Sequence, residues 1–299
     1  LTDDRMTLEF SGPRELHRSN ATDNNAQLAA LAKPEAEPAA IKAARTGATA
    51  ESWRHRAEML AHSDMHDAAY DDFVRALSID HHDEPSLSQI VREAVLTGRA
   101  ADALSWVRGL TINDAPHVPT LVALSQLLEA TGAHAEAIAT ATRARQLAPA
   151  DARGAQQLAS LHAEAGDLTA LDQAVETLRA VAPDGAAAHY YTAVALYLHG
   201  DTKGAVASAT RARAADPAFA PLYDLLGSAH ARLGQLDEAR TAFQQSLALD
   251  AHDSSAYANL GVIEQAAGHP ARARGYFAEA LSLDPDSPVA RAAIGASSP

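Results

Sequence analysis

The fold is decided by residues 220–253, APLYDLLGSAHARLGQLDEARTAFQQSLALDAHD, and by residues 254–287, SSAYANLGVIEQAAGHPARARGYFAEALSLDPDS. The two stretches have the same length and place a glycine, Gly234 or Gly268, at the same position. In both, a glycine also precedes this residue by seven positions and a phenylalanine follows it by nine. Self-similarity at a fixed period indicates a repeat protein in which each unit is one supersecondary element.

The same pattern continues upstream at intervals of 34 residues. The glycine column comprises Gly98, Gly132, Gly166, Gly200, Gly234 and Gly268, with Asp64 one step before it. Nine residues later stand Phe73, Val107, Ala141, Val175, Ala209, Phe243 and Phe277, and prolines follow at Pro149, Pro183, Pro217 and Pro285. Glycine adopts positive φ without steric cost, so each column glycine is predicted to end the first helix of a pair. Proline lacks an N–H and stops the second helix.

The period predicts an all-α chain of about seven helix–turn–helix units between residues 50 and 287. Their predicted bounds are 50–83, 84–117, 118–151, 152–185, 186–219, 220–253 and 254–287. Small side chains let the two helices of a unit approach closely, and the residue nine after the glycine fills the gap between pairs. The second unit departs most from the pattern, because Arg92 and Glu93 stand beside its small-residue position. Residues 288–299 are predicted to form a partial C-terminal cap.

These columns resemble the tetratricopeptide repeat (TPR) family. The matching residues are Trp53 in the first unit, Tyr223, Leu226, Gly227, Gly234, Ala239 and Phe243 in the sixth, and Tyr257, Leu260, Gly261, Gly268, Ala273, Phe277, Ala280 and Pro285 in the seventh. The resemblance implies a right-handed superhelical solenoid whose first helices line a concave groove for a protein or peptide. It therefore implies a non-catalytic scaffold with no cofactor.

Composition excludes several other classes of function. The formal net charge of −14 argues against a nucleic-acid or anionic-membrane surface, since both need clustered Lys and Arg. No apolar run is long enough to span a bilayer. The chain has no cysteine, which excludes disulfides and thiolate chemistry and is compatible with any compartment, the cytoplasm being slightly favoured. No phosphate-binding or nucleophile-elbow motif occurs, so we expect no catalysis.

Residues 1–49 do not follow the repeat. Met6, Leu8 and Phe10 alternate with polar residues, which predicts a short strand in an arm of residues 1–20. Residues 21–49 are Ala-rich and interrupted by prolines, which predicts a helical linker or cap. The stretch LTDDRMTLEF with the following Pro-Arg resembles the C-terminal end of spermidine-synthase-like proteins, so residues 1–20 can alternatively be the tail of an upstream domain of that kind. The start at Leu1 is consistent with a piece of a longer polypeptide, whose repeats would be a structural or regulatory region.

The family resemblance also implies where a partner would bind. Candidate groove residues at the implied positions are Arg153, Gln156, Gln157, Tyr190, Tyr191, Tyr197, Asp224, Arg232 and Asn259. The three tyrosines fall within one predicted helix, and tyrosine is enriched at interface hot spots. The alternative interpretation is that these rings fill space in an Ala-rich core. The Lys and Asn clamp that some family members use for a C-terminal carboxylate is absent, so we expect a different protein or peptide ligand.

Two further clusters have structural explanations that we prefer. His62 and His66 have a spacing seen in metal sites, but the repeat places them on opposite sides of a turn, so no metal site is predicted. Arg145, Arg179 and Arg213 occupy one repeat position near the ends of second helices, where the helix dipole favours positive charge. Contact with an upstream domain and self-association through the partial cap remain open alternatives for the partner.

Overall fold

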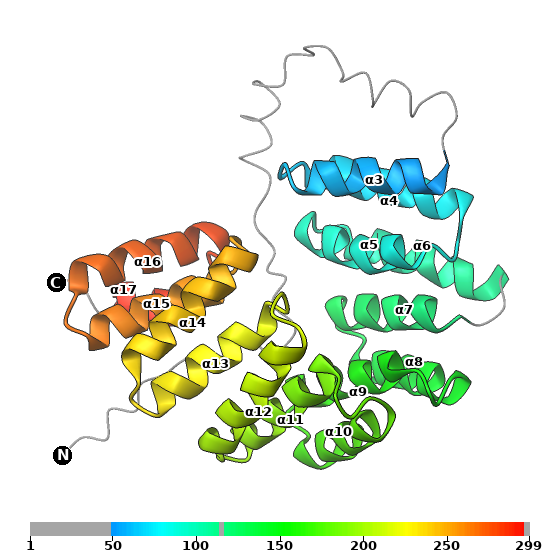
Figure 1. Ribbon diagram of the computed structural model, residues 1–299. Helices are drawn as coiled ribbons and strands as arrows, with labels where there is room; N and C mark the ends of the chain where they lie inside the picture. Colours follow the sequence, from blue (N-terminus) through cyan, green and yellow to red (C-terminus); the bar gives the residue numbers. More distant parts are fainter. Residues whose placement is uncertain (1–48, 114–116, 296–299) are drawn as a thin grey trace, which may run out of the picture. The chain divides into compact units, whose positions relative to one another are not determined.

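The computed structural model describes residues 49–113 and 117–295, and every regular element in these residues is a helix (Figure 1). The first three pairs are α3 (Ala50–Ala61) and α4 (His66–Ile79), α5 (Glu84–Leu96) and α6 (Ala100–Asn113), and α7 (Val118–Ala130) and α8 (His134–Leu147). The next four pairs are α9 (Ala152–Glu164) and α10 (Leu168–Val181), α11 (Ala186–Leu198) and α12 (Thr202–Ala215), α13 (Pro221–Arg232) and α14 (Leu236–Leu249), and α15 (Ser254–Ala266) and α16 (Pro270–Leu283). A last helix, α17, spans Pro288–Gly295. The prediction of an all-α chain of consecutive helix pairs is confirmed.

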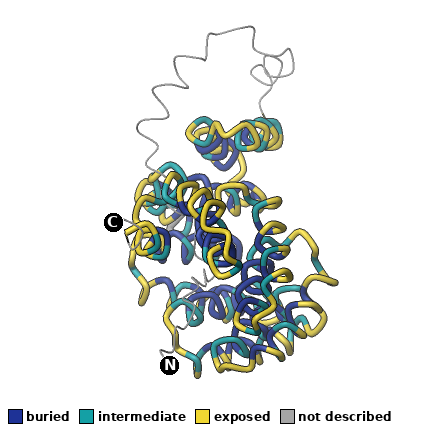
Figure 2. The backbone as a smooth tube through the Cα atoms, turned by 90° about the vertical axis from the view of Figure 1, so that its left-hand side faces the viewer, coloured by how far each residue is buried: buried dark blue, intermediate teal, exposed yellow. Residues whose placement is uncertain are grey.

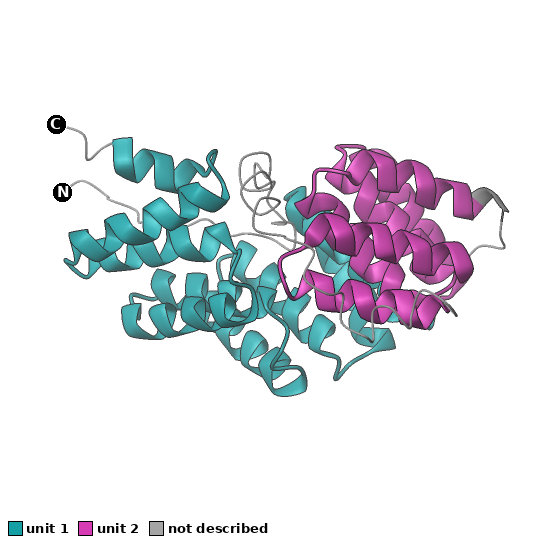
Figure 3. Ribbon diagram, turned by 90° about the horizontal axis from the view of Figure 1, so that it is seen from above, with its two compact units in different colours: residues 1–17, 150–299 teal, residues 18–149 magenta. Residues whose placement is uncertain are grey.

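The helices pack as a repeat within each of two compact units, residues 49–149 and residues 150–295 (Figure 3). In both units the second helix of a pair contacts its own first helix and the first helix of the next pair, as α12 does with α11 and α13. The last helix, α17, packs on α15 and α16 at the C-terminal end of the second unit. The predicted strand in the arm of residues 1–20, the predicted linker of residues 21–49 apart from residue 49, and residues 296–299 lie outside the described residues.

The turns within the pairs follow from the glycine column. At the end of α5, Gly98 has φ +69°, and the N–H of the next residue, Arg99, donates to the carbonyl of Ala94 at 2.7 Å. This bond uses a carbonyl that the ended helix leaves without a partner, which is the usual role of a left-handed residue at a helix C-terminus. All six column glycines have positive φ, and Asp64 takes the same conformation at φ 56°.

Several helix starts are fixed by aspartate. The side chain of Asp83 accepts a hydrogen bond from the backbone N–H of Ser86 at the start of α5, and Asp167 does the same for Ala170 in α10. Such caps satisfy N–H groups that have no partner inside the helix and stabilise it by about 1 kcal/mol each. Asp151, Asp201 and Asp253 cap α9, α12 and α15 in the same way, so part of the negative charge of the chain has a local structural role.

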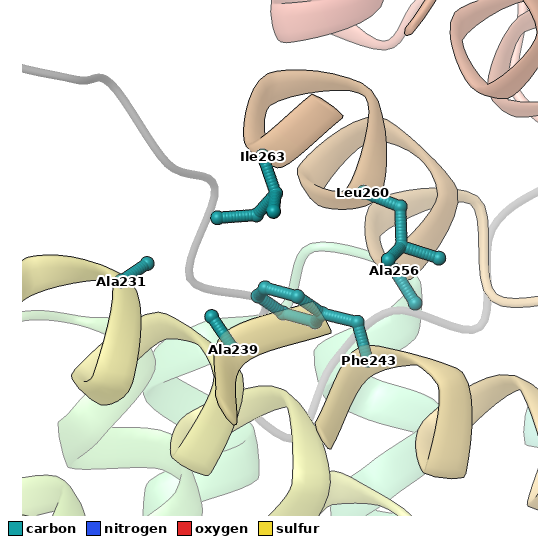
Figure 4. Packing of buried hydrophobic residues seen from close by; sticks show 6 residues of the cluster. All are labelled: Ala231, Ala239, Phe243, Ala256, Leu260 and Ile263. Carbon is teal, nitrogen blue, oxygen red and sulfur yellow. The ribbon is translucent and has the colours of Figure 1, made fainter. Parts of the chain in front are cut away.

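The core consists mainly of alanine and leucine with a few aromatic rings between the helix pairs, and in Figure 2 buried positions (dark blue) recur along the helices among intermediate and exposed ones. The ring of Phe243 from α14 is fully buried, and Figure 4 shows it among residues of α13 and α15. A Cβ built on Gly227 would lie 2.6 Å from Cε1 of this ring. The small residue seven before the column glycine is therefore required by the ring nine after it. The residues in Figure 4 are Ala231, Ala239, Phe243, Ala256, Leu260 and Ile263.

Candidate functional site

The first helices of successive pairs lie beside one another in each unit. In residues 150–295, α9 contacts α11, α11 contacts α13, and α13 contacts α15. We call the surface formed by these four helices the C-terminal face. In residues 49–149, α3, α5 and α7 form the equivalent N-terminal face. All nine candidate groove residues belong to the C-terminal face, because each lies in α9, α11, α13 or α15.

Tyr190 and Tyr191 of α11 lie in the interior, with exposed fractions of 0% and 3%. Their ring centroids are 5.0 Å apart in an edge-to-face arrangement, and the ring of Phe219 packs 4.9 Å from that of Tyr190 on another side. Aromatic pairs with this geometry stabilise a core beyond the effect of area burial. The structure therefore favours the alternative interpretation for these two rings, in which they fill space in an alanine-rich core.

Phe219 was not found by sequence reasoning, because it lies in the segment between α12 and α13, outside the helical positions to which the family resemblance assigns the groove. The available signal was composition. The chain has only five phenylalanines, and one placed in a connecting segment is unusual unless its ring packs against something.

Burial changes the chemistry of both hydroxyl groups. It raises the pKa of Tyr190 well above its usual value, an effect reinforced by Tyr191 and Asp224. Burial also raises the pKa of Tyr191, although a hydrogen bond with Ser160 acts in the opposite direction. Both phenols therefore stay protonated at neutral pH and act as hydrogen-bond donors. Among the described residues, neither the Tyr190 hydroxyl nor that of Ser228 on the neighbouring α13 has a hydrogen-bond partner.

Tyr197 lies near the end of α11 and is half-buried. The guanidinium of Arg232 stacks 5.2 Å from its ring centroid, and Nη1 of Arg232 donates to the Tyr197 carbonyl at 3.4 Å. Burial raises the pKa of Tyr197, and Arg232 partly offsets this increase. Arg232 itself is exposed, so this stacked pair is the accessible part of the tyrosine group.

The remaining candidate residues differ in how accessible they are. The guanidinium of Arg153 is held by Asp151, the residue that caps α9, with Nη2 2.6 Å from Oδ2. Gln156 is half-buried and Gln157 is buried. Asp224 and Asn259 are also buried, so much of the polar character of the C-terminal face lies below the surface.

The two faces differ in burial at the same repeat positions. On the C-terminal face, the fifth position of the repeat is buried at Tyr190, Asp224 and Ala258 and partly exposed at Gln156. The ninth position is buried at Ser160, Val194 and Ser228 and partly exposed at Val262. On the N-terminal face none of the matching residues is buried, namely Arg54, Ser88, Val122, Glu58, Arg92 and Gln126. Side-chain size does not explain the difference, because Ser88 is exposed while Ser228 is fully buried.

The histidines of the first unit are divided by a turn, since α3 ends at Ala61 and α4 begins at His66. Nδ1 of His66 lies 2.8 Å from Oε2 of the buried Glu93, and this hydrogen bond raises the pKa of His66 above 6.5 despite its burial. Within residues 49–113 and 117–295, no three His, Asp or Glu side chains come together in a way that could hold a metal ion.

None of the described helices combines the length and apolar character that a bilayer crossing needs.

Comparison with known families agrees with a repeat fold for the compact unit of residues 150–295. Two family models, both described as tetratricopeptide repeat, match residues 157–218 and residues 219–286. The chain has a tetratricopeptide-repeat fold. The TPR resemblance of the glycine and phenylalanine columns is thus confirmed, whereas nothing supports the resemblance of residues 1–14 to spermidine-synthase-like proteins. No curated protein matches the chain.

Solved structures, two of them described as TPR proteins, show the same fold at low identity. A chain of the Cut9–Hcn1 hetero-tetramer of APC/C is 14% identical, with a TM-score of 0.63, 93% of this chain covered and 60% of that chain covered. A TPR protein from Parabacteroides merdae is 13% identical, with a TM-score of 0.58 and coverages of 82% and 97%. A thermophilic TPR protein from Thermus thermophilus is 22% identical, with a TM-score of 0.53 and coverages of 60% and 98%. TPR repeats build extended binding surfaces, so a scaffold that binds protein or peptide is typical of this fold.

Proposed function

We propose that the chain is a non-catalytic scaffold whose C-terminal face binds an extended protein or peptide segment. The observation that carries this proposal is the accessible stack of Arg232 on Tyr197, in which the guanidinium lies 5.2 Å from the ring centroid. It joins the ends of two neighbouring first helices, α11 and α13. The neighbouring hydroxyl groups of Tyr190 and Ser228 are fully buried and belong to the core.

The surroundings of this stack suit a peptide better than a small molecule. The Tyr197–Arg232 stack lies at the accessible end of α11 and α13, and Gln156 adds a partly exposed amide on α9. Polar side chains on α9, α11 and α13 can therefore contact successive residues of an extended segment, which rises by about 3.3 Å per residue. A stacked arginine and tyrosine are also residue types that dominate binding energy at protein interfaces.

The test removes the exposed guanidinium and leaves the core unchanged. Peptides are selected on the whole chain from a random display library, and their dissociation constants are measured by calorimetry for the wild type and for Arg232→Ala. We expect Arg232→Ala to weaken binding about 30-fold or more, which corresponds to the roughly 2 kcal/mol that truncation of a hot-spot residue costs. The stability of the free chain should change little, because Arg232 is exposed.

The matched control is Tyr223→Phe. The Tyr223 hydroxyl already donates to the carbonyl of Pro217 at 2.8 Å, so its loss should lower stability and leave peptide affinity unchanged. Equal affinities of the wild type and Arg232→Ala for every selected peptide, or the failure of any peptide to bind, would contradict the proposal.

A further inference from the structure

A pocket of about 460 Å³ opens on the compact unit of residues 49–149, and its walls come from two second helices, α4 and α6. The N-terminal face of the same unit is formed by first helices, so the pocket is a separate surface. The residues that line it include Tyr70, Val74, Arg75, Arg99, Asp102 and Trp106.

Both arginines of the pocket stack on an aromatic ring and pair with a carboxylate. The guanidinium of Arg99 lies 3.9 Å from the ring centroid of Tyr70, and its Nη1 donates to Oδ1 of Asp71 at 2.8 Å. The guanidinium of Arg75 lies 4.9 Å from the ring centroid of Trp53 and donates to a buried aspartate of α4 at 2.6 Å. A guanidinium suits this arrangement because its flat face is attracted to a ring while its N–H edge pairs with a carboxylate.

Trp106 and Asp102 supply the ring and the carboxylate of the same arrangement without the guanidinium. They are four residues apart in α6, which places them on one face of the helix, and both line the pocket. Trp106 is partly exposed and Asp102 is exposed. Among the described residues, no cation stacks on the Trp106 ring and no ion pair engages Asp102. Tryptophan is the aromatic side chain that attracts a cation most strongly, so the pair is suited to one more guanidinium.

The charges of the pocket favour a cationic ligand. Both arginines that line it are already paired with aspartates, which leaves the carboxylate of Asp102 as the charge without a counterpart. The chain as a whole is also acidic, with a formal net charge of −14, and therefore attracts basic partners. We infer that the pocket binds an arginine side chain from a basic segment of a partner protein, with the guanidinium stacked on Trp106 and paired with Asp102.

Arginine fits this site better than lysine does. Val74 adds an apolar wall against which the methylene groups of an arginine side chain can pack. A lysine ammonium could pair with Asp102, but it has no flat face to lay on the Trp106 ring. The site is also independent of the proposed function, because the C-terminal face belongs to the other compact unit.

The chain has only two tryptophans, so its indole N–H signals in NMR spectra of the whole ¹⁵N-labelled chain report on the pocket directly. Trp106→Phe identifies the Trp106 signal. The probe is the synthetic peptide acetyl-Gly-Arg-Gly-Arg-Gly-amide at low ionic strength. We expect it to shift the Trp106 signal in a saturable way and to leave the signal of Trp53, whose ring Arg75 already covers, nearly unchanged. The same peptide with glutamate in place of arginine should shift neither signal.

Asp102→Asn should raise the dissociation constant of the arginine peptide about two- to fivefold, the range expected for an exposed ion pair. Glu51→Gln is the matched control, because Glu51 is likewise an exposed carboxylate in the first turn of a helix of this unit but does not line the pocket. It should leave the dissociation constant unchanged, and circular dichroism establishes that both variants keep their helices. An unmoved Trp106 signal, an equal shift with the glutamate peptide, or equal dissociation constants for Asp102→Asn and Glu51→Gln would overturn the inference.

Discussion

The close approach of α15 and α16 depends on Gly261, and replacing it with alanine tests that dependence. A Cβ at this position would lie 2.5 Å, 2.6 Å and 2.8 Å from Cε1, Cδ1 and Cζ of Phe277. Carbon atoms normally pack at about 3.5–4.0 Å, so the ring would have to retreat by about 1 Å. Phe277 is 3% exposed and packs against Ala258, Ala273 and Ala280, which leaves little space for that movement.

The magnitude follows from two opposing effects. Overpacking of a filled core costs about 1–3 kcal/mol, whereas alanine in place of glycine inside a helix contributes about 0.5–1 kcal/mol of stability. We therefore expect Gly261→Ala to destabilise by about 1–2 kcal/mol. Gly275→Ala is the matched control, because Gly275 lies in α16 of the same pair, is exposed, and has nothing within 4 Å of a built Cβ. It should stabilise the chain by about 0.5–1 kcal/mol.

The assay is urea unfolding followed by circular dichroism at 222 nm. Repeat proteins can unfold in parts, so comparing two variants of one helix pair keeps the unfolding unit the same. The opposite signs of the two alanine substitutions are the diagnostic result. Adding Phe277→Leu to Gly261→Ala should recover part of the loss, with a coupling energy that the single variants do not predict. Equal midpoints for Gly261→Ala and Gly275→Ala would refute the claim that ring and glycine must fit together.

Two further predictions concern buried charges with opposite pH dependence. The Glu93 hydrogen bond raises the pKa of His66. The pair therefore stabilises the fold below pH 6.5, and this contribution is lost as the pH rises through the folded pKa. Glu93→Gln should lower the His66 titration midpoint measured by NMR, because the effect of burial then dominates. Burial acts to raise the pKa of Glu264, but hydrogen bonds from Arg240 at 2.5 Å and His269 at 2.8 Å outweigh it and lower the pKa below 4.5. The stability that Glu264 contributes is therefore present above pH 4.5 and is lost as the pH falls through the lower folded pKa. Glu264→Gln should cost about 1–3 kcal/mol at pH 7, and it should reduce the loss of stability at acid pH measured by urea unfolding. An unchanged loss of stability at acid pH would contradict the assignment.

The fold could be predicted well from the sequence because the repeat consists of positions at which backbone geometry and packing restrict the residue type. Gly234 ends α13 with φ +76°, and Phe243 fills the space above Gly227, so both positions tolerate few alternatives. The candidate site was harder to predict. Whether Tyr190 faces solvent or packs against Phe219 depends on a connecting segment that the period does not describe. The pairing of Arg153 with Asp151 likewise depends on rotamers that no spacing determines.

The difference between the two faces has a consequence for how function is distributed along the chain. The period fixes the glycines, the small residues and the rings, and it leaves the fifth and ninth positions of each first helix free to vary. On the N-terminal face these positions hold solvated side chains such as Ser88 and Arg92, which gain little from binding because they are already satisfied by water. On the C-terminal face they hold Tyr190 and Ser228, which are buried in the helix packing. Both units share that packing, so the proposed binding surface has to be tested at side chains that the period does not fix, such as the exposed Arg232 stacked on Tyr197.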